Sequence, residues 1–563
     1  MTKGLPLRAL PALTLLAMLG PVAAGLWGTV LPAFGHFPVA GQSGPSLDPI
    51  RHLLDWPGLG KAIWLSVFTG VTATVVSLGL VVLITAGWWG TRTFRALERI
   101  LSPLLSVPHA AAAFGLAFLI APSGWFARIA SPVLTGWDRP PDWLIVNDPW
   151  GLSLVAGLVA KEVPFLLLMT LAALGQSDGT RGLRVAQALG YGRLTGWVKC
   201  VFPRVYAQIR LPVFVVLAFG MSVVDVAVIL GPSTPPPLSV QILRWMNDPD
   251  LSQRLTAAAG ALLQLALVLG TLGVWILAER AIGAAGRRWT ARGGRGRFET
   301  GLRWIGFVTG GASAIAVLAG LSGLVVWSFA GFWAFPDALP GGFGLRNWNR
   351  HWPGITDAFT DTAVVALVSA GLALALVIGC LEAETRSGRT LTRRGLWLLY
   401  LPLLVPQTAF LPGLQTLLLS LGADRGLGPV IAAHLVFVLP YVFLSLGDPW
   451  RAWDQRNARV AASLGATPAA VLWRVRLPML LRPILTAVAV GVAVSVGQYL
   501  PTLLIGGGRV ATLTTEAVAL ASGGDRRAIG VYAVAQTAAA LLPFAAALAI
   551  PALMWRNRRG LHG

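Results

Sequence analysis

Residues 184–203 read RVAQALGYGRLTGWVKCVFP, a basic stretch between long apolar runs. Residues 459–478, RVAASLGATPAAVLWRVRLP, repeat this pattern 275 positions later without a gap. The identical pairs are Arg184/Arg459, Val185/Val460, Ala186/Ala461, Leu189/Leu464, Gly190/Gly465 and Pro203/Pro478. Because the offset is about half of the 563-residue chain, the repeat indicates two copies of one unit.

The rest of the composition is that of a membrane protein. The chain is 55% hydrophobic and 12% charged, with a mean hydropathy of +0.70, whereas soluble domains have roughly 25% charged residues. Several apolar runs exceed the roughly 18 to 20 residues that cross a bilayer. They are residues 62–91, 304–336, 395–423, 483–508 and 528–555. The sequence therefore predicts an all-α polytopic membrane protein, with the lipid bilayer as one partner.

The net charge of +21 raises the possibility of nucleic-acid binding. With a cytoplasmic N-terminus and twelve spans, most of the 44 Lys and Arg residues fall on the inner side, and most of the 23 Asp and Glu residues fall elsewhere. This bias is the positive-inside pattern of membrane topology. We therefore expect no nucleic-acid partner. The predicted location is a bacterial inner membrane, crossed many times, with both termini cytoplasmic.

Neither the cysteines nor the histidines suggest a disulfide or a metal site. Cys200 and Cys380 both fall on the predicted cytoplasmic side, where a structural disulfide is not expected. The six His residues are scattered, so we expect no metal and no cofactor. The apolar run at residues 9–33 resembles a signal peptide, but removing it would leave eleven spans. An uncleaved first helix fits better.

The chain divides into two tandem six-span domains. The first is residues 1–278, with a core at about 61–278, and the second is residues 304–563, with a core at about 357–556. A Gly/Arg-rich cytoplasmic linker, residues 279–303, joins them. The expected spans are 9–33, 62–89, 101–121, 151–175, 211–231, 255–278, 304–330, 357–381, 396–421, 429–447, 483–506 and 528–555. Domains of equal orientation imply a pseudo-twofold axis along the membrane normal.

Each copy of the repeat predicts a helix, a glycine turn and a short amphipathic helix that ends before a proline. In the second copy Thr467 precedes Pro468, a favourable pair at a helix start. A single loop of this kind could be a basic helix lying on the membrane surface. Two copies in register favour a docking element for a duplicated partner.

The repeat resembles the EAA loop of binding-protein-dependent ABC importer permeases, E-A-A-x-x-x-G followed by I-x-L-P. The matching residues are Ala186, Gly190, Pro203, Ala461, Gly465, Leu477 and Pro478. The acidic first residue of the motif is Arg184 in one copy and Arg459 in the other. No contact of that glutamate is carried over. Nearly the whole chain resembles a fused pair of such MetI-like permease domains, like those of thiamine and ferric-iron importers.

This resemblance implies a transport subunit that is not itself an enzyme. Each loop would form a coupling helix in a groove of a separate cytosolic ATPase, present in two copies. A periplasmic substrate-binding protein would deliver the substrate. The sequence agrees, because residues 58–61, GLGK, lack the spacing and the following Ser or Thr of a phosphate-binding loop.

Ionisable and polar groups within the expected spans are candidates for the translocation pathway. They are Lys161, Glu162 and Asp225 in the first domain, and His434, Gln498 and Tyr499 in the second. The residues 275 positions after the first three are Val436, Phe437 and Leu500, so the charges belong to one domain. The alternative is structural, with Lys161 pairing with Glu162 or with Asp225 to fix helix packing.

Two other classes of protein compete with the importer permease. An ion-coupled secondary transporter with twelve spans would carry charges within the spans of both domains and would lack paired docking loops. A membrane-embedded enzyme would require an acid/base or metal cluster at one membrane face. The substrate stays open among thiamine-like compounds, ferric iron, polyamines and small anions.

Overall fold

The computed structural model describes residues 5–38, 41–42, 44–176, 179–296, 299–388 and 392–554. Across these residues the chain is helical, and extended backbone pairs only at two isolated bridges, Phe37 with Gln42 and Ala330 with Phe343. The expected all-α fold is therefore confirmed. Lys3, residues 297–298 of the expected linker and the basic end at 555–563 lie outside the described residues.

The first half of the structure contains α1 (Leu5–Ala33), α2 (Asp48–Asp55), α3 (Leu59–Trp88), α4 (Arg92–Leu104), α5 (His109–Ile120), α6 (Trp125–Ala130), α7 (Leu152–Gly175), α8 (Gly179–Ala188), α9 (Arg193–Cys200), α10 (Phe202–Ser222), α11 (Asp225–Leu230), α12 (Leu238–Met246) and α13 (Gln253–Ala291). The second half contains α14 (Glu299–Phe329), α15 (Arg346–Ser387), α16 (Arg393–Leu404), α17 (Gln407–Ser420), α18 (Gly428–Ala452), α19 (Arg456–Ser463), α20 (Pro468–Val471), a π-helical turn (Leu472–Arg476), α21 (Leu477–Met479), α22 (Leu481–Val496), α23 (Leu500–Gly506), α24 (Leu513–Ala519), a 3-10 turn (Leu520–Gly523) and α25 (Arg526–Met554).

Ten helices of the described chain are long and apolar enough to cross a bilayer. Two further pairs qualify as bent spans: Gly395–Leu404 with Gln407–Ser420, bent by 81°, and Pro468–Met479 with Leu481–Val496, bent by 75°. Counting each bent pair as one crossing gives twelve, in agreement with the expected number.

Four of the expected spans consist of two helices with a break between them. The breaks fall in residues 101–121, 211–231, 396–421 and 483–506. Prolines explain two of them, because a residue before proline is disfavoured in the helical conformation. Val405 is extended directly before Pro406, and Pro108 lies directly before α5. The other two breaks, at 223–224 and 497–499, open short helices, α11 and α23, that the sequence did not separate.

The internal repeat extends well beyond the two loops. Helices α9, α10, α11 and α12 begin at Arg193, Phe202, Asp225 and Leu238. Their counterparts α20, α21, α23 and α24 begin at Pro468, Leu477, Leu500 and Leu513, each 275 residues later. The same offset therefore relates a whole series of elements, which supports duplication of one folding unit.

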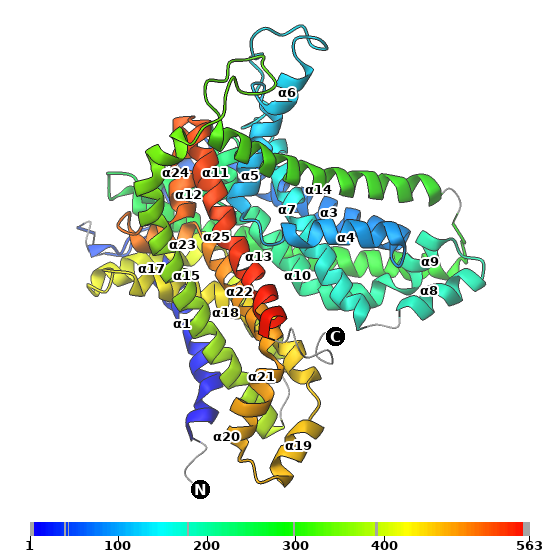
Figure 1. The fold of residues 1–563 in the computed structure, drawn as a ribbon. Helices are drawn as coiled ribbons and strands as arrows, with labels where there is room; N and C mark the ends of the chain where they lie inside the picture. Colours follow the sequence, from blue (N-terminus) through cyan, green and yellow to red (C-terminus); the bar gives the residue numbers. More distant parts are fainter. Residues whose placement is uncertain are drawn as a thin grey trace.

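The first helix of each half packs against the core of the other half. α1 packs on α17 and α15, whereas α14 packs on α5 and α3. Figure 1 shows α14 running alongside α3 and α1 running alongside α15. The two halves are therefore interlocked rather than laid side by side.

Glycines permit both of these crossings. Gly28 of α1 lies against Gly413 of α17, and Gly115 of α5 lies against Gly320 of α14, backbone to backbone. A Cβ added at Gly413 would overlap the backbone of α1 at Gly25 and Thr29. Small residues allow such close approach between membrane helices, where van der Waals packing largely replaces the hydrophobic effect.

Replacing Gly413 with Ala is expected to destabilise the protein, because neither backbone can move away without repacking α1. Overpacking of this kind costs about 1–3 kcal/mol. Thermal unfolding of the purified protein in detergent measures the effect. Gly371→Ala, in α15, is the matched control, because nothing lies within 4 Å of its added Cβ. Equal melting temperatures for the two variants would contradict the proposed role of the crossing.

Candidate functional site

The first repeat loop, residues 184–203, folds as a helix, a glycine turn and a second helix. Gly190 follows the end of α8 with a φ of +82°, in the left-handed region. Its N–H donates to the Gln187 carbonyl at 2.9 Å, and the N–H of Tyr191 donates to the Ala186 carbonyl at 3.1 Å. These bonds satisfy carbonyls at the helix end, in a geometry that favours glycine.

The second repeat loop, residues 459–478, has the same turn. Gly465 has a φ of +84°. Its N–H donates to the Ala462 carbonyl at 2.9 Å, and the N–H of Ala466 donates to the Ala461 carbonyl at 3.0 Å. The two loops therefore share a backbone turn and not merely a sequence pattern. In Figure 1 they lie at two separate ends of the molecule, α8 and α9 at one and α19 and α20 at the other.

Both repeat loops expose apolar side chains at matching positions. Val185 and Leu189 are 53% and 60% exposed, and their counterparts Val460 and Leu464 are 60% and 82% exposed. Trp473, on the second loop, is 69% exposed. Grouped apolar side chains on a protein surface mark contact with another macromolecule or a membrane.

The other predicted loop residues divide between surface and interior. Ala186 is buried, Ala461 and Leu477 are half-buried, and Arg184, Arg459, Pro203 and Pro478 are exposed. The two arginines that replace the acidic residue of the family motif therefore point to solvent, beside the exposed apolar side chains.

A buried arginine holds the second repeat loop to the helices beneath it. Arg476 is 4% exposed, and its Nη1 donates to Oε2 of Glu382 at 2.7 Å. Its guanidinium also lies 4.5 Å from the ring centroid of Trp453 and 5.2 Å from that of Trp450. The first loop has Val201 at the matching position. The sequence did not identify the pair of Arg476 and Glu382.

Lys161 is bound to backbone carbonyls at a helix break. Its ammonium donates to the carbonyls of Leu104 at 2.9 Å, Leu105 at 3.3 Å and Val107 at 2.5 Å. These carbonyls lie at the C-terminal end of α4 and in the bend before α5, where they lack helical partners. The ammonium therefore stabilises the break. In the described residues it forms no ion pair with Glu162 or Asp225, which the sequence had offered as structural partners.

Glu162 is buried beside His109. Its Oε1 lies 4.0 Å from Nε2 of His109, and the imidazole stacks obliquely on Phe219 with ring centroids 4.9 Å apart. His109 follows Pro108 at the start of α5. The break that Lys161 stabilises therefore also brings His109 to Glu162, a contact that the sequence did not predict.

His434 joins three helices of the second half. It is 1% exposed, with Nδ1 2.7 Å from the hydroxyl of Ser495 and Nε2 2.8 Å from the hydroxyl of Thr502. Both ring nitrogens are thus engaged by α22 and α23. This geometry suits a structural link better than a position on a solvated pathway.

Exchanging Lys161 for Met separates the structural role of the ammonium from a pathway role. The variant should be less stable, because each buried backbone carbonyl left without a donor costs about 1–3 kcal/mol. Thermal unfolding in detergent and uptake of substrate into cells are the two measurements. Glu162→Gln is the control, since it removes a charge without removing those bonds. A Lys161→Met protein that is fully stable but inactive in uptake would instead assign the ammonium to the pathway.

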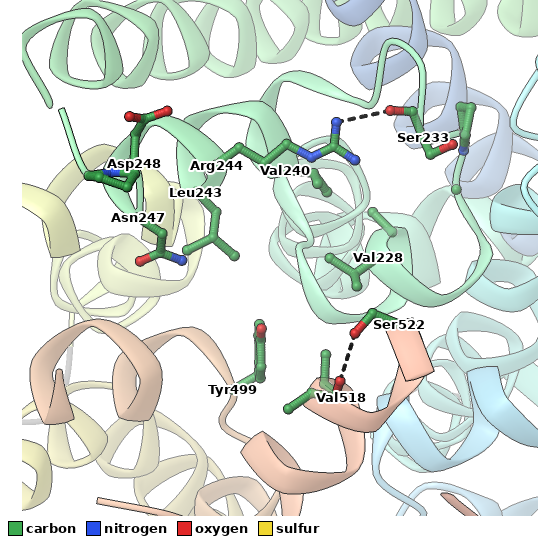
Figure 2. A pocket seen from close by; sticks show the side chains of 15 residues that line it. Val228, Ser233, Val240, Leu243, Arg244, Asn247, Asp248, Tyr499, Val518 and Ser522 are labelled. Atoms are coloured by element: carbon green, nitrogen blue, oxygen red, sulfur yellow. Dashed lines mark hydrogen bonds between the residues drawn. The ribbon is translucent and has the colours of Figure 1, made fainter. Parts of the chain in front are cut away.

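A cavity of about 510 Å³ lies between the two halves. Its lining contains three pairs of residues related by the 275-residue offset: Leu243/Val518, Arg244/Ala519 and Asn247/Ser522. Figure 2 shows the two sets on opposite sides of the cavity, with Tyr499 directed between them. Equivalent positions of the repeat therefore contribute to one cavity from both halves, and we call it the axial cavity.

The first half supplies the charged groups of the axial cavity. Arg244 and Asp248 line it, and Nη1 of Arg244 donates to the Ser233 carbonyl at 2.9 Å. In the second half their counterparts are Ala519 and Gly523. The sequence had placed Arg244 in an outer loop and did not propose it as a site residue. The one signal for Arg244 in the sequence is that the repeat has an arginine at this position in one half and Ala519 in the other.

The structure brings few of the predicted pathway residues to this cavity. Tyr499 lines it, and Asp225 begins α11, whose Ala227 and Val228 also line it. Gln498 precedes Tyr499 in the chain and is 7% exposed. Lys161, Glu162 and His434 are not part of its lining. No group of three or more potential metal ligands occurs in the described part of the chain.

The chain resembles permeases along most of its length. It is 28% identical to the inner membrane ABC transporter permease protein YnjC of Escherichia coli over 543 residues, which cover 95% of this chain and 98% of that protein. It is 31% identical over 183 residues to the molybdenum transport system permease protein ModB of Mycobacterium tuberculosis, covering 29% of this chain and 68% of ModB. It is 26% identical over 184 residues to the putrescine transport system permease protein PotI of Escherichia coli, covering 30% of this chain and 64% of PotI. No solved structure matches it.

Residues 371–554 match the family described as binding-protein-dependent transport system inner membrane component. This segment includes the second repeat loop and all the helices from α16 to α25. The multi-pass helical fold agrees with the match. The chain thus belongs to the binding-protein-dependent transport system inner membrane components, as a permease subunit of an ABC importer.

Proposed function

We propose that the two repeat loops are the coupling loops of this importer, each docking on one of two cytosolic ATPase subunits. The observation that carries the proposal is the occurrence of one glycine-turned helical protrusion twice, with exposed apolar side chains at the same positions. A duplicated surface suits a duplicated partner related by the same pseudo-twofold axis. The ATPase subunits would supply the energy for transport.

Two permease domains make up the chain in this proposal. They comprise residues 1–278 and 304–563, joined by residues 279–303. The series of helices related by the 275-residue offset supports this division. α1 and α14 each pack on the core of the other half. A displacement of one loop would therefore also displace helices of the opposite half.

The axial cavity would receive substrate on the periplasmic side from a substrate-binding protein. α10 begins beside the first repeat loop at Phe202 and ends at Ser222, close to α11 and the cavity. Its 21 residues span about 30 Å, the thickness of the apolar part of a bilayer. If the loops face the cytoplasm, as the positive-inside pattern predicts, the cavity opens toward the other side. Both termini would then be cytoplasmic.

An ion-coupled secondary transporter is less well supported. Such a protein needs titratable or oxygen-rich groups available to a coupling ion near the middle of the membrane. The Lys161 ammonium is occupied by three backbone carbonyls, and both nitrogens of His434 contact hydroxyl groups. Because these groups are already engaged, the paired loops are a stronger indication of ATP as the energy source than the buried charges are of an ion gradient.

Placing a charge on both loops should weaken ATPase binding strongly. In the double variant Leu189→Asp/Leu464→Asp a carboxylate would be buried at each interface, and a hot-spot loss of about 2 kcal/mol weakens binding roughly 30-fold. Co-purification of the full-length protein with its cognate ATPase is the measurement. Leu421→Asp is the control, because Leu421 is 69% exposed at the end of α17, outside both loops. Undiminished ATPase binding by the double variant would refute the coupling assignment.

Removing the Arg244 side chain should lower uptake without affecting ATPase binding. The guanidinium is the cationic group of the axial cavity, so its loss changes how substrate enters. Uptake by proteoliposomes at saturating binding protein is the measurement, and we expect a several-fold reduction. Arg139→Ala removes an exposed arginine outside the cavity and should leave uptake unchanged. Equal uptake by the two variants would remove Arg244 from the pathway.

A further inference from the structure

A residue at the end of the linker, the first residue of α14, caps a helix of the first repeat loop. α9 begins after Gly192, which has no side chain to accept a hydrogen bond. Glu299, the first residue of α14, accepts from the N–H of Leu194 at 3.0 Å and from the N–H of Thr195 at 2.8 Å. These groups are among the N–H donors that a helix leaves unpaired at its start, where the helix dipole also favours a carboxylate.

The chain leading to Glu299 also runs along α9. The Gly192 N–H donates to the Arg295 carbonyl at 2.9 Å. Lys199 donates to the Gly294 carbonyl at 2.7 Å, and its ammonium lies 4.3 Å from the centroid of the Trp289 ring. The expected linker is therefore in contact with α9 at both of the helix's ends.

The second repeat loop caps its own helix. Thr467 stands 275 residues after Gly192, and its hydroxyl accepts from the Ala470 N–H at 3.2 Å at the start of α20. The second loop thus caps its helix with its own threonine, whereas the first loop is capped by Glu299 at the end of the linker.

Gly192 is needed for space and not for its backbone conformation. Its φ of −58° and ψ of 159° are open to any residue. A Cβ at this position, however, would overlap the Glu299 carboxylate. The external cap and an internal side-chain cap therefore exclude each other at this site.

We propose that Glu299 is a positioning residue for ATPase coupling, holding α9 in the orientation in which the first repeat loop docks. The inference rests on the proposed coupling function of the loops. α14 is well suited to this task because it packs along α3 and α5. Its first residue, Glu299, therefore moves together with those two helices. The first docking site then depends on the linker and the start of α14, whereas the second depends on its own loop alone.

A reciprocal pair of substitutions tests the inference in the full-length protein. Glu299→Ala should speed amide hydrogen exchange of α9 about 5- to 30-fold, the loss expected for a helix cap. It should also reduce the ATP hydrolysis that the binding protein stimulates in the reconstituted complex. Gly192→Ala alone should have the same effects, because its Cβ would displace the carboxylate and supply no acceptor in its place. The double variant Glu299→Ala/Gly192→Thr should restore slow exchange and stimulated hydrolysis.

Thr467→Ala is the matched control, because it should speed exchange in the second loop and leave α9 unchanged. Unchanged exchange of α9 in Glu299→Ala would overturn the inference. Faster exchange with full stimulated hydrolysis would overturn it too, since the cap would then be structural only. Failure of the unaltered protein to bind its cognate ATPase would refute the proposed function itself, and the inference would fall with it. Thermal unfolding identifies any variant that is globally destabilised.

Discussion

The arrangement of the whole molecule depends on two places where helix backbones touch. At Gly28 with Gly413, and at Gly115 with Gly320, the first helix of one half lies directly on the core of the other. In a membrane the apolar surfaces gain little by leaving lipid, so contact of this kind depends on close van der Waals packing. Because both crossings exist, the halves cannot part without losing them. The axial cavity and the two protruding loops keep their mutual positions for the same reason.

The sequence predicts the fold class, the number of crossings and the repeat, because each of these depends on composition or on local pattern. The turns at Gly190 and Gly465 are of this kind, since the chemistry of the turn is local. The sequence does not predict that α1 and α14 each pack on the opposite half. Many helices carry glycines, and only the packed structure shows which glycines are in contact. The sequence also misses the bends before Pro108 and Pro406, where long apolar runs outweighed the proline signal.

The candidate site was partly predicted, for a similar reason. Lys161 and His434 were singled out because polar groups within spans are costly, but that cost does not distinguish a pathway from a structural link. In the structure Lys161 contacts backbone carbonyls, and His434 contacts the hydroxyls of Ser495 and Thr502. These contacts favour a structural role for both residues. Tyr499 does line the axial cavity. Arg244 escaped notice because an arginine between two spans is common, and only its position in the wall of the axial cavity makes it distinctive.

The contact of Glu299 with α9 bears on why the two halves share one polypeptide. A pair of identical subunits would have two identical caps, and every change would appear on both sides of the axis. Here covalent linkage fixes a one-to-one ratio of two different halves, so each is free to diverge. The first half has Arg244 and Asp248 at the positions where the second half has Ala519 and Gly523. Joining the halves thus gives the protein an asymmetric cavity, which a homodimer could not encode.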